Sequence, residues 1–316
     1  MEIYLAKTQG FCAGVSFAID IVEQALRKYG APLYVYHEIV HNTYVVNDFR
    51  NRGVIFVENL NDVPQGRRVI FSAHGVPPSV IQTAKERKLK YVDATCPLVT
   101  KVHNEATKFS RLHQAIVLIG HKGHQELIGT AGYVDPELLY IVENEDDIES
   151  LDIDPDTEVA YITQTTLSVD DANRIIDRLR ARFPQLEGPP KDDICYATQN
   201  RQEAVGLLSS EADAVIVLGS QNSSNSQRLR ELARERGVPS YLIDGAADID
   251  PAWFTGDETV VVTAGASAPE SVVQECLEWL RDRYGASIEA RSIRDEEVHF
   301  PLPRELRNLP PIVATS

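Results

Sequence analysis

The chain has 316 residues, of which 43% are hydrophobic and 25% charged, and 47 acidic against 31 basic side chains give a formal net charge of −16. This composition is typical of a globular protein of two or three domains that folds without disulfide bonds. The acidic excess argues against nucleic-acid binding and against a polybasic membrane anchor, since both require clustered Lys and Arg. The N-terminus lacks a signal-peptide pattern and no apolar run is long enough for a membrane helix, so we expect a cytoplasmic protein.

The first predicted unit begins at Cys12, which precedes a helical pattern that ends at Gly30, a residue type common at helix C-termini. A short apolar strand then leads to a polar loop with His41, a second strand leads to Asn59, and a third leads to His74. Strands that alternate with helices in this way indicate a parallel α/β unit.

The second predicted unit begins at Cys96 and repeats this order of elements. Pro97 occupies the favoured first position of the helical pattern that follows. The first strand of this unit leads to a polar loop with His121 and His124, and its last strand leads to Thr165.

The third predicted unit begins at Cys195, and its polar loops are the Ser- and Asn-rich segment 219–226 and the loop with Ser267. In all three units the second strand ends in an Asn or Asp turn at nearly the same distance from the cysteine. The turn residues are Asn59, Asn144 and Asp244, which follow their cysteines by 47, 48 and 49 residues. This agreement indicates an internal repeat of three α/β units.

We therefore predict an α/β fold of three similar small lobes, arranged with pseudo-threefold symmetry around a common centre. The predicted parts are an N-terminal strand and loop over 1–13, a first lobe over 14–96, a second over 97–193, a third over 194–284 and a C-terminal tail over 285–316. By circular analogy, Ile3–Ala6 should pair with the third lobe, and the tail should lie across the lobes.

The predicted centre collects the cysteines and the polar loops, because ligand sites of α/β sheets lie at the C-terminal ends of strands and at helix N-termini. The helix N-termini should also favour the thiolate form of the cysteines. The expected ring around the three thiols consists of His41, His74, His121, His124, Thr165, Ser223, Asn225 and Ser267.

The three repeated cysteines lack the closely spaced pairs that are typical of a structural zinc site. A cubane iron–sulfur cluster usually has four cysteine ligands, and with three of them one iron keeps an open coordination position that suits a substrate. Cys276 lies within the helical pattern 271–280 instead, so we interpret it as a buried structural thiol.

The polar loops allow two interpretations each. Segment 219–226 lies between a strand and a helix, where it forms either a phosphate cradle or only a turn and an N-cap. Ser267 and Glu270 match a capping box, so helix capping is the alternative role of Ser267. Glu126 follows His124 by two residues and is interpreted as a proton carrier, with a solvated loop carboxylate as the alternative.

Eight longer motifs follow one another along the chain. They are 10–14 (GFCAG), 37–42 (HEIVHN), 72–75 (SAHG), 93–103 (DATCPLVTKVH), 163–168 (TQTTLS), 192–198 (DDICYAT), 219–226 (GSQNSSNS) and 263–269 (TAGASAP). In wording and order they resemble the 4-hydroxy-3-methylbut-2-enyl diphosphate reductase family, the LytB/IspH reductases of the methylerythritol phosphate route to isoprenoids. The likeness covers nearly the whole chain.

The resemblance implies a central [4Fe-4S] cluster held by Cys12, Cys96 and Cys195, with one open iron site. It also implies the two-electron reductive dehydroxylation of (E)-4-hydroxy-3-methylbut-2-enyl diphosphate to isopentenyl and dimethylallyl diphosphate. A small redox protein of the ferredoxin or flavodoxin type would donate the electrons. The implied catalytic residues are Glu126, Thr165 and His124. The implied substrate-binding residues are His41, His74, His124, Thr165, Ser223, Ser224, Asn225 and Ser267.

The chain departs from the family at Gln125, where the family usually has Pro between the His and the Glu of this loop. Loss of that φ restraint puts the rigidity of the Glu126 loop in doubt. Two alternatives stay open, namely a quinolinate synthase-like cluster enzyme with three lobes and a non-catalytic iron–sulfur sensor or electron carrier. The Ser-rich loop favours the reductase over the first, and an open iron site argues against the second.

Overall fold

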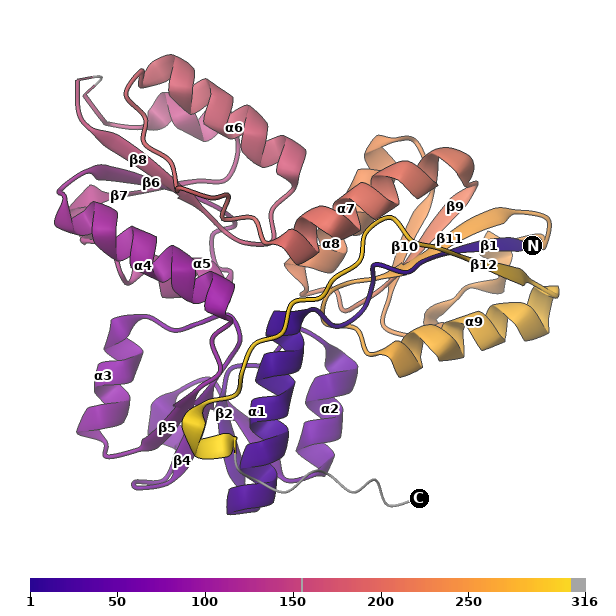
Figure 1. Ribbon diagram of the computed structural model, residues 1–316, viewed down its shortest axis with the longest axis horizontal. Helices are drawn as coiled ribbons and strands as arrows, with labels where there is room; N and C mark the ends of the chain where they lie inside the picture. Colours follow the sequence, from indigo (N-terminus) through magenta and orange to yellow (C-terminus); the bar gives the residue numbers. More distant parts are fainter. Residues whose placement is uncertain (155, 308–316) are drawn as a thin grey trace.

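The computed structural model describes residues 1–154 and 156–307. Three parallel sheets surround a common centre, and helices lie on both faces of each sheet (Figure 1). The predicted α/β fold of three lobes is therefore confirmed. Within the described residues, no helix is long and apolar enough to cross a membrane.

The first lobe contains the strands β2 (Leu33–Tyr36), β3 (Val54–Val57), β4 (Arg68–Phe71) and β5 (Lys90–Asp93) and the helices α1 (Ala13–Tyr29), α2 (Thr43–Asn51) and α3 (Pro78–Glu86). The order in its sheet is β3-β2-β4-β5. Successive strand residues point to opposite faces, so Val35 packs in the core beneath α1, whereas Tyr34 packs in the core beneath α3.

The second lobe contains the strands β6 (Ala115–Ile119), β7 (Leu139–Val142) and β8 (Val159–Thr163) and the helices α4 (Pro97–Arg111), α5 (Gln125–Ala131) and α6 (Val169–Arg182). The order in its sheet is β7-β6-β8. Val117 of β6 packs toward α6, and its neighbours Ile116 and Leu118 pack toward α4.

The third lobe contains the strands β1 (Glu2–Ala6), β9 (Ala214–Leu218), β10 (Ser240–Ile243), β11 (Thr259–Ala264) and β12 (Ser287–Arg291) and the helices α7 (Tyr196–Leu208), α8 (Ser224–Glu235) and α9 (Glu270–Tyr284). The order in its sheet is β10-β9-β11-β1-β12. The N-terminal strand β1 pairs with β11 in parallel, with Ile3 opposite Val260. This confirms that the N-terminal strand completes the third lobe.

The predicted C-terminal tail needs a correction. Its first part, β12, is an edge strand of the third sheet and pairs with β1. The chain then runs past the centre to α1 (Figure 1), where Phe300 packs against the first lobe's core and Leu306 is buried in it. The sequence of β12 hides this strand, because Ile288 is its only large apolar residue. Residues 308–316 of the predicted tail lie outside the described residues.

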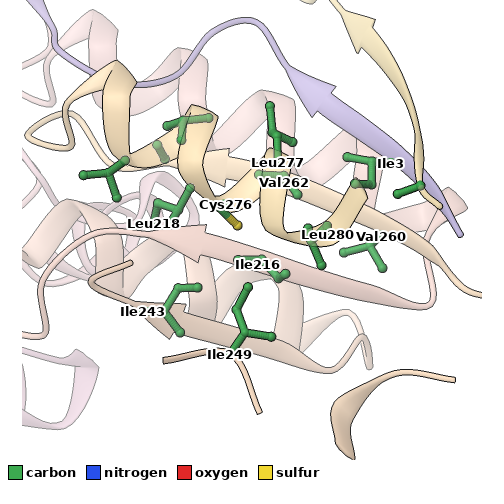
Figure 2. Close-up of a cluster of buried hydrophobic side chains, with 14 of the residues drawn as sticks. Ile3, Ile216, Leu218, Ile243, Ile249, Val260, Val262, Cys276, Leu277 and Leu280 are labelled. Carbon is green, nitrogen blue, oxygen red and sulfur yellow. The ribbon is translucent and has the colours of Figure 1, made fainter. Parts of the chain in front are cut away.

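Cys276 is fully buried in the core between α9 and the third sheet. Figure 2 shows its side chain directed from the helix toward the strands, among Leu218, Ile216 and Leu280. The interpretation of Cys276 as a structural thiol is therefore confirmed. The divisions of the chain after residues 13, 96, 193 and 284 remain predictions.

Candidate active site

One cavity lies where the three lobes meet, and it holds about 770 Å³ of space, part of which is open to solvent. Strand ends and helix N-termini of all three lobes contribute to its walls. The lining includes all residues that the family resemblance implied: Cys12, Cys96, Cys195, His41, His74, His124, Glu126, Thr165, Ser223, Ser224, Asn225 and Ser267. Segments that are far apart in the sequence thus form one site.

Each of the three lining cysteines directly precedes a helix: Cys12 is the N-cap of α1, Cys96 of α4 and Cys195 of α7. Burial raises the pKa of Cys96 to about 12 and that of Cys195 to about 11. For Cys96 and Cys195, the expectation that the helix N-termini would favour thiolates is therefore wrong for the protein alone, because desolvation outweighs the backbone N–H groups. A bound cation is needed to hold these thiols deprotonated.

The thiols that line the cavity are soft ligands for a metal group. Within the described part of the chain, no three His, Cys, Asp or Glu side chains approach closely enough to hold one metal ion. Gly14 lies beside two of the sulfurs, because a Cβ atom at this position would lie 2.5 Å from Sγ of Cys96 and 3.9 Å from Sγ of Cys12. Three soft thiols that line one cavity are suited to an iron–sulfur cluster.

Replacing Gly14 by alanine should lower the iron content of the protein strongly, because the added methyl group would lie against the sulfurs of Cys96 and Cys12, two of the implied ligands. The fold should persist, since α1 already contains Gly14 and alanine is a better helix former. Iron per chain and circular dichroism measure the two effects. Gly245→Ala is the matched control, because its Cβ would meet no atom closer than 4.0 Å. Equal iron contents in both variants would contradict this account of the cysteine site.

Three histidines form one wall of the cavity. The ring centroids of His41 and His74 are stacked 4.0 Å apart, and His124 lies edge-on at 5.5 Å from His41 and 5.8 Å from His74. Burial lowers the pKa of His74 well below its usual value and that of His124 to about 3. These two rings are therefore neutral at pH 7. Nδ1 of His124 accepts the backbone N–H of Glu126, so its ring proton resides on Nε2.

Glu126 is buried at the N-terminus of α5, which excludes its interpretation as a solvated loop carboxylate. Its Oε1 accepts the backbone N–H of Thr165 at 2.6 Å, and its Oε2 accepts the Thr165 hydroxyl at 2.9 Å. Burial is the main cause that raises the pKa of Glu126 to about 7. Although Gln125 replaces the family's proline, it begins α5 with His124 as the N-cap. A carboxyl group with this pKa can both hold and release a proton at neutral pH.

The Ser- and Asn-rich loop of the third lobe forms a second wall of the cavity. Ser223 is the N-cap of α8, and the Ser224 Oγ accepts a hydrogen bond from the hydroxyl group of Thr166 in the second lobe at 3.0 Å. Both Nδ2 and Oδ1 of buried Asn225 lack a hydrogen-bond partner among the described residues. Such buried orphan groups indicate a missing ligand, because an unpartnered amide in a protein interior is costly.

Ser267 does not cap a helix, so the capping-box alternative is wrong. The helix α9 begins at Glu270 with Pro269 as its N-cap and without a side-chain cap. The Ser267 hydroxyl instead donates to the backbone carbonyl of His41 at 2.8 Å. This bond joins the third lobe to the first at the cavity, a contact that a local sequence pattern does not reveal.

His121 does not line the central cavity, contrary to the sequence-based expectation. It lines a separate depression together with Glu143, Asp171 and Arg228. The turn between His121 and His124 contains Gly123 with φ of 87°, which reverses the chain so that the two histidines face different cavities.

Arg201 was not predicted from the sequence, and its side chain is only 1% exposed. Its guanidinium donates to the carbonyl of Gly10 at 2.8 Å and to Glu296 at 3.0 Å. It thus ties α7, which begins after Cys195, to the loop that carries Cys12. An Arg within a helical segment gave no signal of this contact, since its partners are distant in the sequence.

Replacing Arg201 by alanine should lower the free energy of unfolding by roughly 3–5 kcal/mol, because Glu296 and the Gly10 carbonyl would lose their buried partner. Urea denaturation measures this change. The control is Arg294→Ala, which removes the exposed ion pair with Glu203 and should change the free energy of unfolding far less, because solvent screens exposed charges. Similar losses for the two variants would contradict a structural role of buried Arg201.

Comparison with known proteins gives consistent results. The model of the LytB protein family matches residues 3–281. The chain is 56% identical over 307 residues to a protein named 4-hydroxy-3-methylbut-2-enyl diphosphate reductase from Rhodopirellula baltica, covering 97% of this chain and 96% of that protein. A protein of the same name from Azoarcus is also 56% identical, with 97% of this chain and 98% of that protein covered.

Solved structures agree with the sequence relatives. The structure of the E-1-hydroxy-2-methyl-but-2-enyl-4-diphosphate reductase from Plasmodium falciparum superposes with a TM-score of 0.93 at 38% identity and 96% coverage of both chains. A structure of (E)-4-hydroxy-3-methyl-but-2-enyl diphosphate reductase, described as the terminal enzyme of the non-mevalonate pathway, gives 0.63 at 31% identity and covers 89% of this chain and 100% of that one. The chain therefore belongs to the LytB family.

Proposed function

We propose that the chain is a 4-hydroxy-3-methylbut-2-enyl diphosphate reductase that catalyses the last step of the methylerythritol phosphate pathway. The substrate takes up two electrons and two protons, its C4–oxygen bond breaks, and the hydroxyl group leaves as water. A new C–H bond at either end of the allylic system gives isopentenyl or dimethylallyl diphosphate. The observation that carries this proposal is one cavity that combines three thiols, a buried carboxyl group and an unpartnered amide.

Cys12, Cys96 and Cys195 would hold the [4Fe-4S] cluster. When bound through three cysteines, such a cluster supplies electrons singly and leaves one iron with an open coordination position. The donor set of three thiols and the Cβ-free space at Gly14 support this assignment. Because each turnover consumes two electrons, a small redox protein of the ferredoxin or flavodoxin type is the proposed donor. All four cysteines are free, which supports the reducing cytoplasm as the location.

The diphosphate would bind between the two polar walls. Asn225 offers an amide N–H₂ donor that has no partner within the described residues. The hydroxyl groups of Ser223 and Ser224 lie at the N-terminus of α8, where an anion is favoured. On the other wall, His124 presents its Nε2–H while it is neutral. The substrate-binding residues of the proposal are His41, His74, His124, Thr165, Ser223, Ser224, Asn225 and Ser267.

Glu126 would deliver the proton to the leaving hydroxyl group. Because its pKa is about 7, the Glu126 side chain is protonated in a fraction of the molecules at neutral pH. Glu126 also lines the cavity in which the substrate would bind. Thr165 donates its hydroxyl hydrogen to Glu126 and can pass a proton between that carboxyl group and the substrate oxygen. His124, which accepts the Glu126 backbone N–H, would hold the beginning of α5 and bind substrate through Nε2.

Anaerobic spectroscopy of the iron-loaded protein tests this function. Absorption and electron paramagnetic resonance spectra should change when the allylic diphosphate is added, because the proposal brings the substrate hydroxyl to the cluster site. Spectra that do not change when the allylic diphosphate is added would contradict the proposal and favour an iron–sulfur sensor. A response to the substrates of quinolinate synthase instead would favour the enzyme alternative.

A further inference from the structure

Glu38 lies beside the cavity and is hydrogen-bonded to two lobes. Its Oε2 atom is 3.0 Å from Nδ1 of His41 and 2.8 Å from Nδ2 of Asn222. His41 is the first-lobe member of the histidine wall next to α2, whereas Asn222 directly precedes the Ser223 cap of α8 in the third lobe. Glu38 therefore connects the two polar walls of the proposed diphosphate site.

The Glu38 carboxyl group is ionised at neutral pH. The hydrogen bond from His41 is the largest cause that lowers the pKa of Glu38, and the bond from Asn222 acts in the same direction. An ionised carboxylate can only accept hydrogen bonds. The ring nitrogen Nδ1 of His41 must therefore carry a hydrogen atom.

This constraint makes His41 different from His124. The neutral ring of His124 has its hydrogen on Nε2, because Nδ1 is occupied as an acceptor. The neutral ring of His41 would have a bare Nε2, since Glu38 holds the hydrogen on Nδ1. A diphosphate offers only acceptor oxygens, so His41 can donate to it through Nε2 only as the doubly protonated imidazolium.

The groups around His41 differ in charge. His74 stacks on it and His124 meets its edge, and burial keeps both of these rings neutral. Glu38 contributes the negative charge bonded to the ring, and the cation of Arg50 acts on Glu38 from α2. Among the three rings, His41 is the one whose Nδ1 is bonded to a carboxylate.

We propose that Glu38 is a positioning residue that holds His41 doubly protonated against the substrate's diphosphate and fastens it to the third lobe through Asn222. The inference rests on the proposed function, because it requires a diphosphate in this cavity. It extends that function by making diphosphate binding depend on pH through a residue that touches no substrate.

Calorimetric binding of inorganic diphosphate to the anaerobically purified protein tests the inference. Glu38→Gln removes the charge and keeps the size of the side chain. At about pH 8 the variant should bind roughly tenfold more weakly than the wild type, since His41 then loses its charge. At about pH 5.5 the ratio of the two dissociation constants should approach one, because acid protonates His41 without help. The ratio at each pH cancels the titration of diphosphate itself.

Two further variants separate charge from structure. Glu38→Asp keeps the charge, so it should bind diphosphate more tightly than Glu38→Gln at about pH 8 and equally at about pH 5.5. Glu58→Gln is the matched control, because Glu58 is bonded to His37 at 2.5 Å in the same way but neither residue lines the cavity. Its binding should follow the wild-type profile. Iron content checks that each variant is intact.

The decisive comparison is a double-mutant cycle. If Glu38 acts through His41, Glu38→Gln should have no further effect in a His41→Asn background. An effect that persists there, or a Glu38→Gln deficit that is the same at every pH, would overturn the inference alone. A wild-type protein that binds no diphosphate at any pH would overturn the proposed function as well.

Discussion

Replacing any one of Cys12, Cys96 or Cys195 by serine should remove most of the bound iron and all reductase activity. Each of the three cysteines lines the central cavity from a different lobe, so two remaining ligands cannot span the same cluster. Cys276→Ser should keep both iron and activity, because this thiol lies in the core beneath α9.

Iron per chain and anaerobic turnover, measured on all four serine variants, test this expectation. The Cys276 variant controls for the loss of a cysteine as such. Loss of the cluster in Cys276→Ser alone would show that the internal repeat does not mark the ligands.

Replacing Glu126 by glutamine should lower turnover by about 10²–10⁴-fold, the usual contribution of general acid–base catalysis. Glutamine keeps the size of the side chain but cannot release a proton to the leaving hydroxyl group. Iron content should be unchanged, because Glu126 is not a proposed ligand. Substrate affinity should change little, whereas Asn225→Ala should mainly weaken substrate binding, since its amide has no protein partner among the described residues.

The pH dependence gives a second test of Glu126. Because Glu126 acts as an acid with a pKa of about 7, wild-type turnover should fall as the pH rises through 7. The raised pKa also means that the contribution of this group to stability is present at low pH and is lost as the pH rises through about 7. Glu126→Gln should lose both dependences. A variant with turnover within about threefold of the wild type would exclude the proton relay.

Much of the architecture could be predicted from the sequence, because it rests on local patterns that recur. The cysteine–helix–strand repeat indicated three lobes, and the regular α/β order indicated that the strand Ile3–Ala6 belongs to the third one. Burial of Cys276 followed from its position on a helical pattern. The edge strand β12 was missed, since an exposed strand has too few apolar residues to show alternation.

Side-chain direction and long-range contacts could not be read in the same way. The sequence grouped His121 with His124, but the chain reverses at Gly123, so the two side chains line different cavities. A local capping pattern suggested the wrong partner for Ser267, whose hydroxyl donates to a carbonyl of another lobe. The link from Glu38 to Asn222 spans 184 residues and has no local signature.

Anaerobic turnover with product analysis tests the central claim most directly. The iron-loaded protein would receive (E)-4-hydroxy-3-methylbut-2-enyl diphosphate and a reduced one-electron dye, which replaces the physiological donor. We expect isopentenyl and dimethylallyl diphosphate with two electrons consumed per product molecule, and no product from the Cys195→Ser variant. Unchanged substrate in the presence of an intact cluster and reduced dye would contradict the account.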